Sequence, residues 1–421
     1  MKTPIHFPIE SFAFNFKFGD REYDRFINTR RGFSWETEVS QSQRLPSSSG
    51  VTACPKGLIC LDHTHVPKQV DPVHPGRFIT EVKSKLNVKN MNPGFIDGAD
   101  NIITDRSNTG LQTCLVRLLT SQFHHYLSHD SLQKKSASWN DRVRVGLVDL
   151  SGTKLVQPDF AGWGSTVAMY GASVPKILAL HAAFQLRSDL RSLAVNNGIA
   201  AGKALELAAV NQWKAKGLKS GFPDLIWLFD IRNKTGNLGT LDFSVKARKV
   251  FQGIMHNAEA GELIIRVGFP YMASVTWQAG LFHPSRGGLW LTTSYGKGQW
   301  GNNPIKGVQS ANVTALSAAT YFTLLAQGRL VDDVSSKEMQ TWLRGGCMTK
   351  HFPQGLGLVA SKCGVWSDYW HDCALIARGR IRYVVVVLSR TKPSEFPKYT
   401  QLIRELDNLI VRNNQIPRVA C

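Results

Sequence analysis

The sequence lacks a hydrophobic run long enough to cross a membrane. Its strongest apolar stretch, Val384 to Leu388, has the length of a β-strand, far below the roughly 18–20 residues that a membrane helix needs. The first residues, Met1 to Glu10, contain no apolar core of the kind that defines a signal peptide. We therefore predict a cytoplasmic protein without a membrane segment, and export by another route stays open.

Cysteine is scarce. The seven cysteines are odd in number and widely scattered, which does not indicate a disulfide framework and favours a reducing compartment. One small group could hold a metal, but its spacing matches none of the usual zinc patterns; its members are Cys54, Cys60, His63 and His65. We therefore predict neither a metal site nor a cofactor.

Acidic residues are few beside basic ones. The chain has 50 Lys and Arg against 31 Asp and Glu, which gives a formal net charge of +19. Such a surplus is compatible with a polyanion partner. The basic residues form no polybasic block and no motif of a known nucleic-acid module, so we do not expect nucleic acid as a partner, and polyanion binding remains an alternative interpretation.

The length of 421 residues allows more than one domain. We predict an N-terminal extension of unassigned function at residues 1–105, with a Ser-rich loop at residues 40–50, and one domain at residues 106–421. Apolar spacing indicates strands at both ends of that domain and helices in its middle. The predicted sheet part comprises residues 108–160 and 350–421, and the predicted helical part is residues 161–349.

The stretch Ser173-Val174-Pro175-Lys176 is a Ser-x-x-Lys motif at the start of a predicted helix. Proline is tolerated in the first turn of a helix, so Pro175 places the helix start near Ser173. Residues three apart share a helix face, which brings the Lys176 amine near the Ser173 hydroxyl. A lysine whose pKa is lowered by burial can activate a serine as nucleophile. The alternative is a capping serine before an ordinary helix.

Two further segments complete a pattern that resembles the penicillin-recognising serine enzymes, class A β-lactamases and D-alanyl-D-alanine peptidases. That family carries Ser-x-x-Lys, Ser-Asp-Asn and Lys-Thr-Gly in this order. Here Ser274-Val275-Thr276 resembles the second motif, and Lys362-Cys363-Gly364, on a predicted strand, resembles the third. The resemblance covers about residues 108–416. It implies an α+β fold of the β-lactamase/transpeptidase type: an antiparallel sheet flanked by N- and C-terminal helices, with an inserted all-helical domain.

The resemblance also implies roles for these residues. Ser173 would form an acyl-enzyme with an amide, ester or β-lactam substrate, with Lys176 as its base. Ser274 would relay a proton and Lys362 would hold a substrate carboxylate. The oxyanion hole would consist of the backbone N–H groups of Ser173 and Val365. Other positions would bind the substrate; these are Thr276, Cys363, Gly364 and His371.

Departures from the family pattern limit what it implies. Thr276 replaces an asparagine and Cys363 replaces a threonine or serine, and both are weaker hydrogen-bonding partners. The segment from Leu281 to Gln309 contains no Asp or Glu, whereas class A β-lactamases use a glutamate there to activate the deacylating water. We therefore expect slow deacylation and a function closer to a peptidase than to a β-lactamase. The alternative is a catalytically impaired relative that acts as a binding or scaffold protein.

Overall fold

The computed structural model describes a defined part of the chain; the residues are 14–18, 21–25, 104–105, 110–123, 142–155, 158–215, 221–232, 234–283, 287–297, 310–344 and 357–415. The chain divides into two compact units, residues 1–51 and 52–421. In the first unit, β1 (Phe14–Phe18) and β2 (Arg21–Arg25) form an antiparallel hairpin. The predicted boundary near residue 105 stays a prediction, and the Cys54–His65 group lies outside the described residues.

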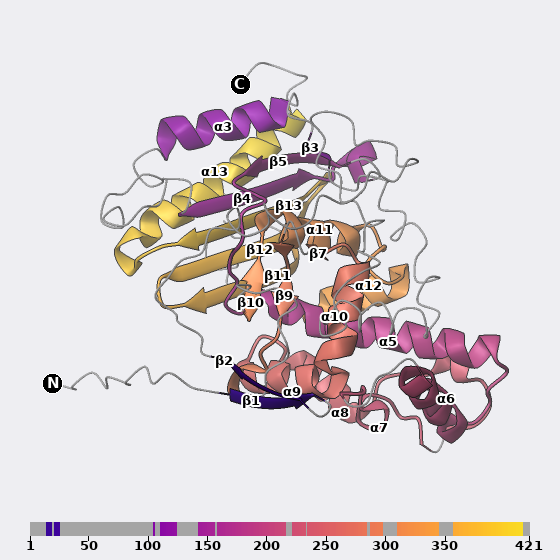
Figure 1. Cartoon of the computed structure of the whole chain (residues 1–421). Helices are drawn as coiled ribbons and strands as arrows, with labels where there is room; N and C mark the ends of the chain where they lie inside the picture. The colour runs from indigo at the N-terminus through magenta and orange to yellow at the C-terminus, as the bar shows by residue number, and fades with distance from the viewer. Residues whose placement is uncertain are drawn as a thin grey trace, which may run out of the picture. The chain divides into compact units, whose positions relative to one another are not determined.

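The second unit is built on a six-stranded sheet with the order β11-β12-β13-β4-β5-β3 (Figure 1). Neighbouring strands are antiparallel, except that β3 and β5 run parallel. This antiparallel sheet, combined with helices, confirms the predicted α+β class. The strands are β3 (Thr104–Asp105), β4 (Val143–Asp149), β5 (Asp159–Trp163), β11 (Gly357–Trp366), β12 (Tyr369–Arg378) and β13 (Ile381–Arg390).

The central strand β13 shows why an unbroken apolar run forms a strand here. Side chains alternate across a sheet, and both faces of this sheet are covered. Val384, Val386 and Leu388 enter the core shared with the helical part. Val385 and Val387 enter a second core, beneath α3 (Gly110–Gln122) and α13 (Phe396–Gln415). A strand buried on both faces needs apolar residues at every position.

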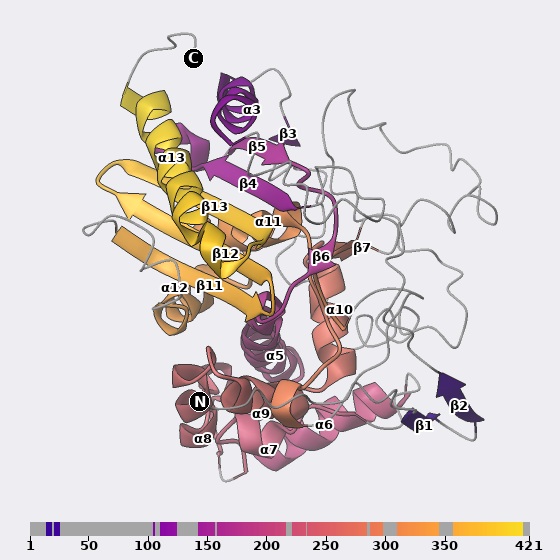
Figure 2. The same ribbon diagram turned by 90° about the vertical axis from the view of Figure 1, so that its left-hand side faces the viewer.

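Helices cover the two faces differently. In Figure 2, α3 and α13 lie on one side of the sheet, while α11 (Ala315–Ala326) lies on the other, against β4 and β13. Within the described ranges, no helix combines the length and the hydropathy needed to span a bilayer. The remaining helices are α5 (Ile177–Asn196), α6 (Gly202–Ala215), α7 (Leu225–Leu228), α8 (Val245–Gln252), α9 (Asn257–Val267), α10 (Phe269–Gln278) and α12 (Asp333–Trp342).

Two turns interrupt the regular elements. A 3-10 turn, η5 (Gly152–Leu155), precedes strand β5. Helix α8 ends at Gln252, and α9 begins at Asn257. The backbone between them turns at residues 253–256, so Asn257 stands at the start of a helix.

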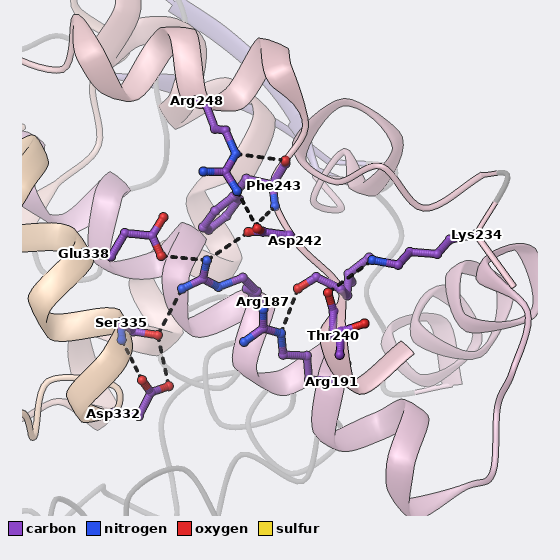
Figure 3. A network of polar contacts seen from close by, with 11 residues as sticks. Arg187, Arg191, Lys234, Thr240, Asp242, Phe243, Arg248, Asp332, Ser335 and Glu338 are labelled. Carbon is purple, nitrogen blue, oxygen red and sulfur yellow. Dashed lines mark hydrogen bonds and ion pairs between the residues drawn. The ribbon is translucent and has the colours of Figure 1, made fainter. Parts of the chain in front are cut away.

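A buried arginine joins the helical part to the segment that leads into β11 (Figure 3). Arg187 of α5 is 3% exposed and bonds to Asp242 at 3.1 Å, to Glu338 at 2.8 Å and to Ser335 at 3.2 Å. Glu338 and Ser335 belong to α12. The carbonyl of Leu343, which follows α12, accepts a hydrogen bond at 2.7 Å from the N–H of Ser361 in β11.

We expect Arg187→Met to lower the free energy of unfolding by about 2 kcal/mol. Breaking a buried ion pair typically costs more, but Asp242 and Glu338 are partly exposed, so water compensates them in part. Urea denaturation followed by circular dichroism measures the change. The control Lys337→Ala removes an exposed pair with Asp333 and should cost no more than about 0.5 kcal/mol. Equal costs for the two variants would contradict the role of this network.

Candidate active site

Ser173 lies between a short strand and a helix. The strand β6 (Met169–Tyr170) pairs with β10 (Ala311–Val313), and the 3-10 turn η6 (Val174–Lys176) runs directly into α5. Pro175 occupies the first turn, as the sequence predicted. Ser173 is partly exposed and its side chain makes no capping hydrogen bond, so its hydroxyl is not committed to starting the helix.

Lys176 is buried beneath Ser173, with 1% of its surface exposed. Its Nζ donates to Oδ1 of Asn257 at 2.6 Å and to the carbonyl of Met255 at 3.3 Å. Burial lowers the pKa of Lys176 to about 8, while the charge of Glu259 acts in the opposite direction. A lysine with this pKa is partly neutral near pH 8 and can accept the Ser173 proton.

The segment that lies against Lys176 is therefore Met255-His256-Asn257, which the sequence analysis did not select. Asn257 is the first residue of α9 and is exposed to solvent. An asparagine also ends the family's Ser-Asp-Asn motif, but the residue two positions before Asn257 is Met255 and not serine. One matching residue out of three gives a weak sequence signal. The only other hint was the apolar spacing of α9, which begins at this asparagine.

The third motif lies on β11, as predicted. Lys362 is 2% exposed, and its Nζ donates to the carbonyl of Cys363. Burial lowers the pKa of Lys362 to about 7, and repulsion from Lys176 acts in the same direction. The two lysines thus lie near enough to disfavour each other's charged form. This proximity brings the third motif to the Ser-x-x-Lys motif, although they are separated by nearly 190 positions in the sequence.

Gly364 sits directly against the backbone that carries Ser173. A Cβ atom on Gly364 would lie 2.5 Å from the carbonyl oxygen of Gly171 and 3.1 Å from the Ser173 nitrogen. Only glycine permits this approach of two backbones. The next residue, Val365, is 39% exposed. Its N–H and that of Ser173 remain the predicted oxyanion hole, because β11 and η6 meet at this point.

The predicted second motif is placed elsewhere by the structure. Residues 274–276 lie inside α10. Thr276 is 1% exposed, and its hydroxyl donates to the Met272 carbonyl at 2.8 Å. The substrate-binding role of Thr276 is therefore wrong, since its hydroxyl is bonded within its own helix and buried. The side chain of Ser274 lies outside the described residues, so its relay role stays a prediction.

His371 is not a ligand for a substrate carboxylate. It is 1% exposed, and both ring nitrogens have backbone partners. Nδ1 accepts the N–H of Ser389 at 3.1 Å, so Nε2 carries the proton and donates to the Tyr170 carbonyl at 2.7 Å. Burial lowers the pKa of His371 to about 4, although the backbone groups of Tyr170 and Trp370 act in the opposite direction. His371 is thus a neutral residue that fixes β6, three residues before Ser173.

Cys363 is disulfide-bonded, as is Cys114. The predicted contact between a Cys363 thiol and the substrate is therefore wrong, because no S–H remains to donate. Cys363 is paired with Asp372 in the sheet register, whereas Lys362 and Gly364 are paired with Cys373 and His371. Side chains alternate along a strand, so the Cys363 sulfur leaves β11 on the face opposite Lys362.

The assembled site holds a serine, a lysine with a lowered pKa and a second buried lysine. No group of three or more potential metal ligands occurs among the residues that the structure describes. The residues present suit proton transfer and nucleophilic attack on a carbonyl carbon. Lys234-Thr235-Gly236, a literal copy of the third motif, lies apart from this site: Lys234 bonds the Thr240 carbonyl in an exposed loop.

Residues 285–413 match the family model described as the β-lactamase enzyme family. No curated protein matches the sequence. Solved structures with a similar arrangement include PBP-A, with 16% identity over 73% of this chain and 97% of that chain, at a TM-score of 0.42. They also include a β-lactamase from Sphaerobacter thermophilus DSM 20745, with 16% identity over 65% of this chain and 93% of that chain and a TM-score of 0.41.

The TLA-3 extended-spectrum β-lactamase is similar over 71% of this chain and 96% of that chain, with 9% identity and a TM-score of 0.43. The family match includes β11, which carries Lys362, and the two strands that follow it. The match of residues 285–413 to this family model confirms the resemblance to the penicillin-recognising serine hydrolases over that part of the chain.

Proposed function

We propose that this chain is a serine acyl-transfer enzyme that forms an acyl-enzyme on Ser173 with an amide, ester or β-lactam substrate. The observation that supports this most strongly is the environment of Lys176. This buried amine has a lowered pKa and two hydrogen-bond acceptors beside it, and it lies one helical turn from a serine whose hydroxyl is not used for capping.

The proposed reaction begins with transfer of the Ser173 proton to the neutral Lys176 amine. The Ser173 oxygen attacks the carbonyl carbon, and the N–H groups of Ser173 and Val365 stabilise the oxyanion. The C–N or C–O bond then breaks and the leaving group takes the proton back from Lys176. This scheme returns the proton from Lys176 itself, and the relay role of Ser274 stays a prediction.

Deacylation is proposed to be slow. The segment after α10 contains no Asp or Glu between Leu281 and Gln309. Its described part includes β9 (Trp290–Leu291) and the 3-10 turn η8 (Tyr295–Lys297). Without a carboxylate there, a water molecule near the acyl-enzyme has no acidic residue of this segment to activate it. The proposed activity is therefore closer to that of a D-Ala-D-Ala peptidase or transacylase than to that of an efficient β-lactamase.

The disulfide-bonded Cys114 and Cys363 bear on where this activity would occur. Disulfides persist mainly in oxidising compartments. They therefore support an oxidising location for the protein and weaken the basis for the predicted cytoplasmic one.

A second candidate is a binding or scaffold protein that has kept the fold. The buried hydroxyl of Thr276, the disulfide at Cys363 and the fully bonded His371 favour it, because each takes a predicted substrate-binding residue out of that role. Labelling of Ser173 discriminates between the two candidates.

We expect a labelled β-lactam to form a persistent adduct on the Ser173 peptide, measured by intact mass and by peptide mapping. Ser173→Ala should abolish the adduct, because it removes the nucleophile, and Lys176→Ala should slow its formation at least 10²-fold, the lower range for a general base. The matched control Ser192→Ala changes an exposed serine on the same helix and should label normally. Absence of any adduct, with no measurable effect of Lys176→Ala, would support the scaffold candidate instead.

We also expect the acylation rate to change with pH differently for an uncharged substrate and for one that carries a carboxylate. Neutral Lys176 is the base, so the rate with an uncharged ester should rise with pH and level off above about 8. A carboxylate-bearing β-lactam also needs charged Lys362, whose pKa is about 7. The ratio of its second-order rate constant to that of the ester should therefore fall as the pH rises through about 7.

The variant Lys362→Gln tests the second half of that expectation. It should lower acylation by the carboxylate-bearing compound and make the ratio independent of pH, because glutamine does not titrate. A ratio that still falls near pH 7 in this variant would show that another group binds the carboxylate.

A further inference from the structure

One side chain from the segment after α10 reaches both residues on which acylation depends. The hydroxyl of Tyr295, the first residue of η8, donates a hydrogen bond to the carbonyl of Ala172 at 2.8 Å. Ala172 directly precedes Ser173. The ring of the same tyrosine lies over Lys176, with Nζ 4.7 Å from the ring centroid. Tyr295 therefore touches the backbone of the nucleophile and the proposed base at once.

Both ends of this hydrogen bond are conformationally unusual. Ala172 has φ +45° and Tyr295 has φ +52°, in the left-handed region that residues other than glycine rarely adopt. Such a conformation persists only where the surrounding contacts impose it, and it is concentrated at functional sites. The free-energy cost for one residue is comparable to the contribution of one hydrogen bond, so the Tyr295 hydroxyl is sufficient to account for the backbone of Ala172.

The segment that carries Tyr295, residues 293–297, is held in place by contacts that do not involve the Tyr295 side chain. The carbonyl of Ser294 lies so close to Gly261 of α9 that a side chain there would collide with it. Lys297 forms an ion pair with Glu262, also on α9, at 3.2 Å. The backbone N–H of Tyr295 donates to the Thr293 hydroxyl at 3.1 Å. Removing the hydroxyl or the ring of Tyr295 therefore leaves the position of η8 largely fixed.

We propose that Tyr295 is a positioning residue for acylation, whose hydroxyl holds Ala172 in the conformation that orients Ser173 and whose ring shields the amine of Lys176 from water. This inference rests on the proposed function. It gives the segment after α10 a role in forming the acyl-enzyme. In class A β-lactamases, by contrast, a glutamate in this segment acts in hydrolysing the acyl-enzyme.

The charged and titratable groups around Lys176 determine the sign of the ring's effect. Glu259 on α9 favours the ammonium and Lys362 on β11 disfavours it, while Tyr170 lies near Tyr295. The largest influence on the pKa of Lys176 is burial, which lowers it. Loss of the Tyr295 ring would admit water, which raises this pKa, and would remove a cation–π contact, which lowers it. Because the effect of burial is the larger, we expect the pKa of Lys176 to rise.

The first experiment is a set of acylation rates at a single pH, with Tyr295→Phe as the test. This variant keeps the ring and loses the hydroxyl, and we expect acylation to slow about tenfold, the rate equivalent of one hydrogen bond. The matched control is Tyr321→Phe: Tyr321 is a buried tyrosine that also donates to a backbone carbonyl near the start of α5, that of Ile177. It should acylate like the unaltered protein. Equal rates for the two variants would overturn the role of the hydroxyl.

A double-mutant cycle separates conformational control from a general loss of packing. Glycine adopts a positive φ without steric cost, so Ala172→Gly removes the need for the restraint. In that background Tyr295→Phe should slow acylation less than about threefold. An undiminished tenfold effect would contradict the proposal that the hydroxyl acts by holding Ala172.

The second experiment measures the pKa of Lys176 directly and does not depend on activity. The ¹³Cε shift of labelled lysine, assigned with Lys176→Ala, is followed against pH. Tyr295→Ala should raise the pKa from about 8 toward the ordinary value, and Tyr295→Phe should leave it unchanged. A pKa that stays the same in Tyr295→Ala would overturn the role of the ring. If Ser173 is never acylated but the pKa shifts as expected, the proposed function fails while this contact stands.

Discussion

Two buried lysine amines that interact electrostatically are the constraint on which this site depends. Lys176 and Lys362 come from opposite ends of the domain, and burial together with their mutual repulsion opposes charging both at once. The protein stabilises Lys176 with the Asn257 side chain and the Met255 carbonyl, and Lys362 with the Cys363 carbonyl. These are neutral acceptors, so they hold the amines in place without restoring ordinary pKa values. A buried amine that is partly neutral is what a serine nucleophile requires.

The rest of the fold brings these amines together and keeps them there. Gly364 allows β11 to pack against the backbone before Ser173, at a distance that no side chain would tolerate. His371, neutral and fully hydrogen-bonded, holds β6 from the neighbouring strand. Arg187 and α12 connect the helix that begins after Lys176 to the middle of β11, at Ser361. Each contact joins the helical part to the sheet, so the site depends on their relative position.

The departures from the family pattern concern residues that were predicted to bind the substrate. Thr276 is bonded within its own helix, Cys363 is disulfide-bonded, and His371 is bonded to backbone groups. The family resemblance predicted that all three would bind the substrate. The pairing of Ser173 with Lys176 thus stays a proposal, while the structure leaves fewer of the predicted residues available to bind a substrate.

The sequence alone determined the elements whose signals are local. Pro175 indicated where the helical segment begins, and the run from Val384 to Leu388 indicated a buried strand. The Ser-x-x-Lys spacing predicted a hydroxyl and an amine on one helix face. Only the tertiary structure decided which distant residues face that pair. Asn257 and Thr276 both lie in segments with a helical pattern. No local spacing shows that Asn257 begins a helix beside Lys176 whereas Thr276 is buried within a helix. The same holds for His371 and Tyr295, because the carbonyls that they bind become neighbours only when the sheet and the helices pack together.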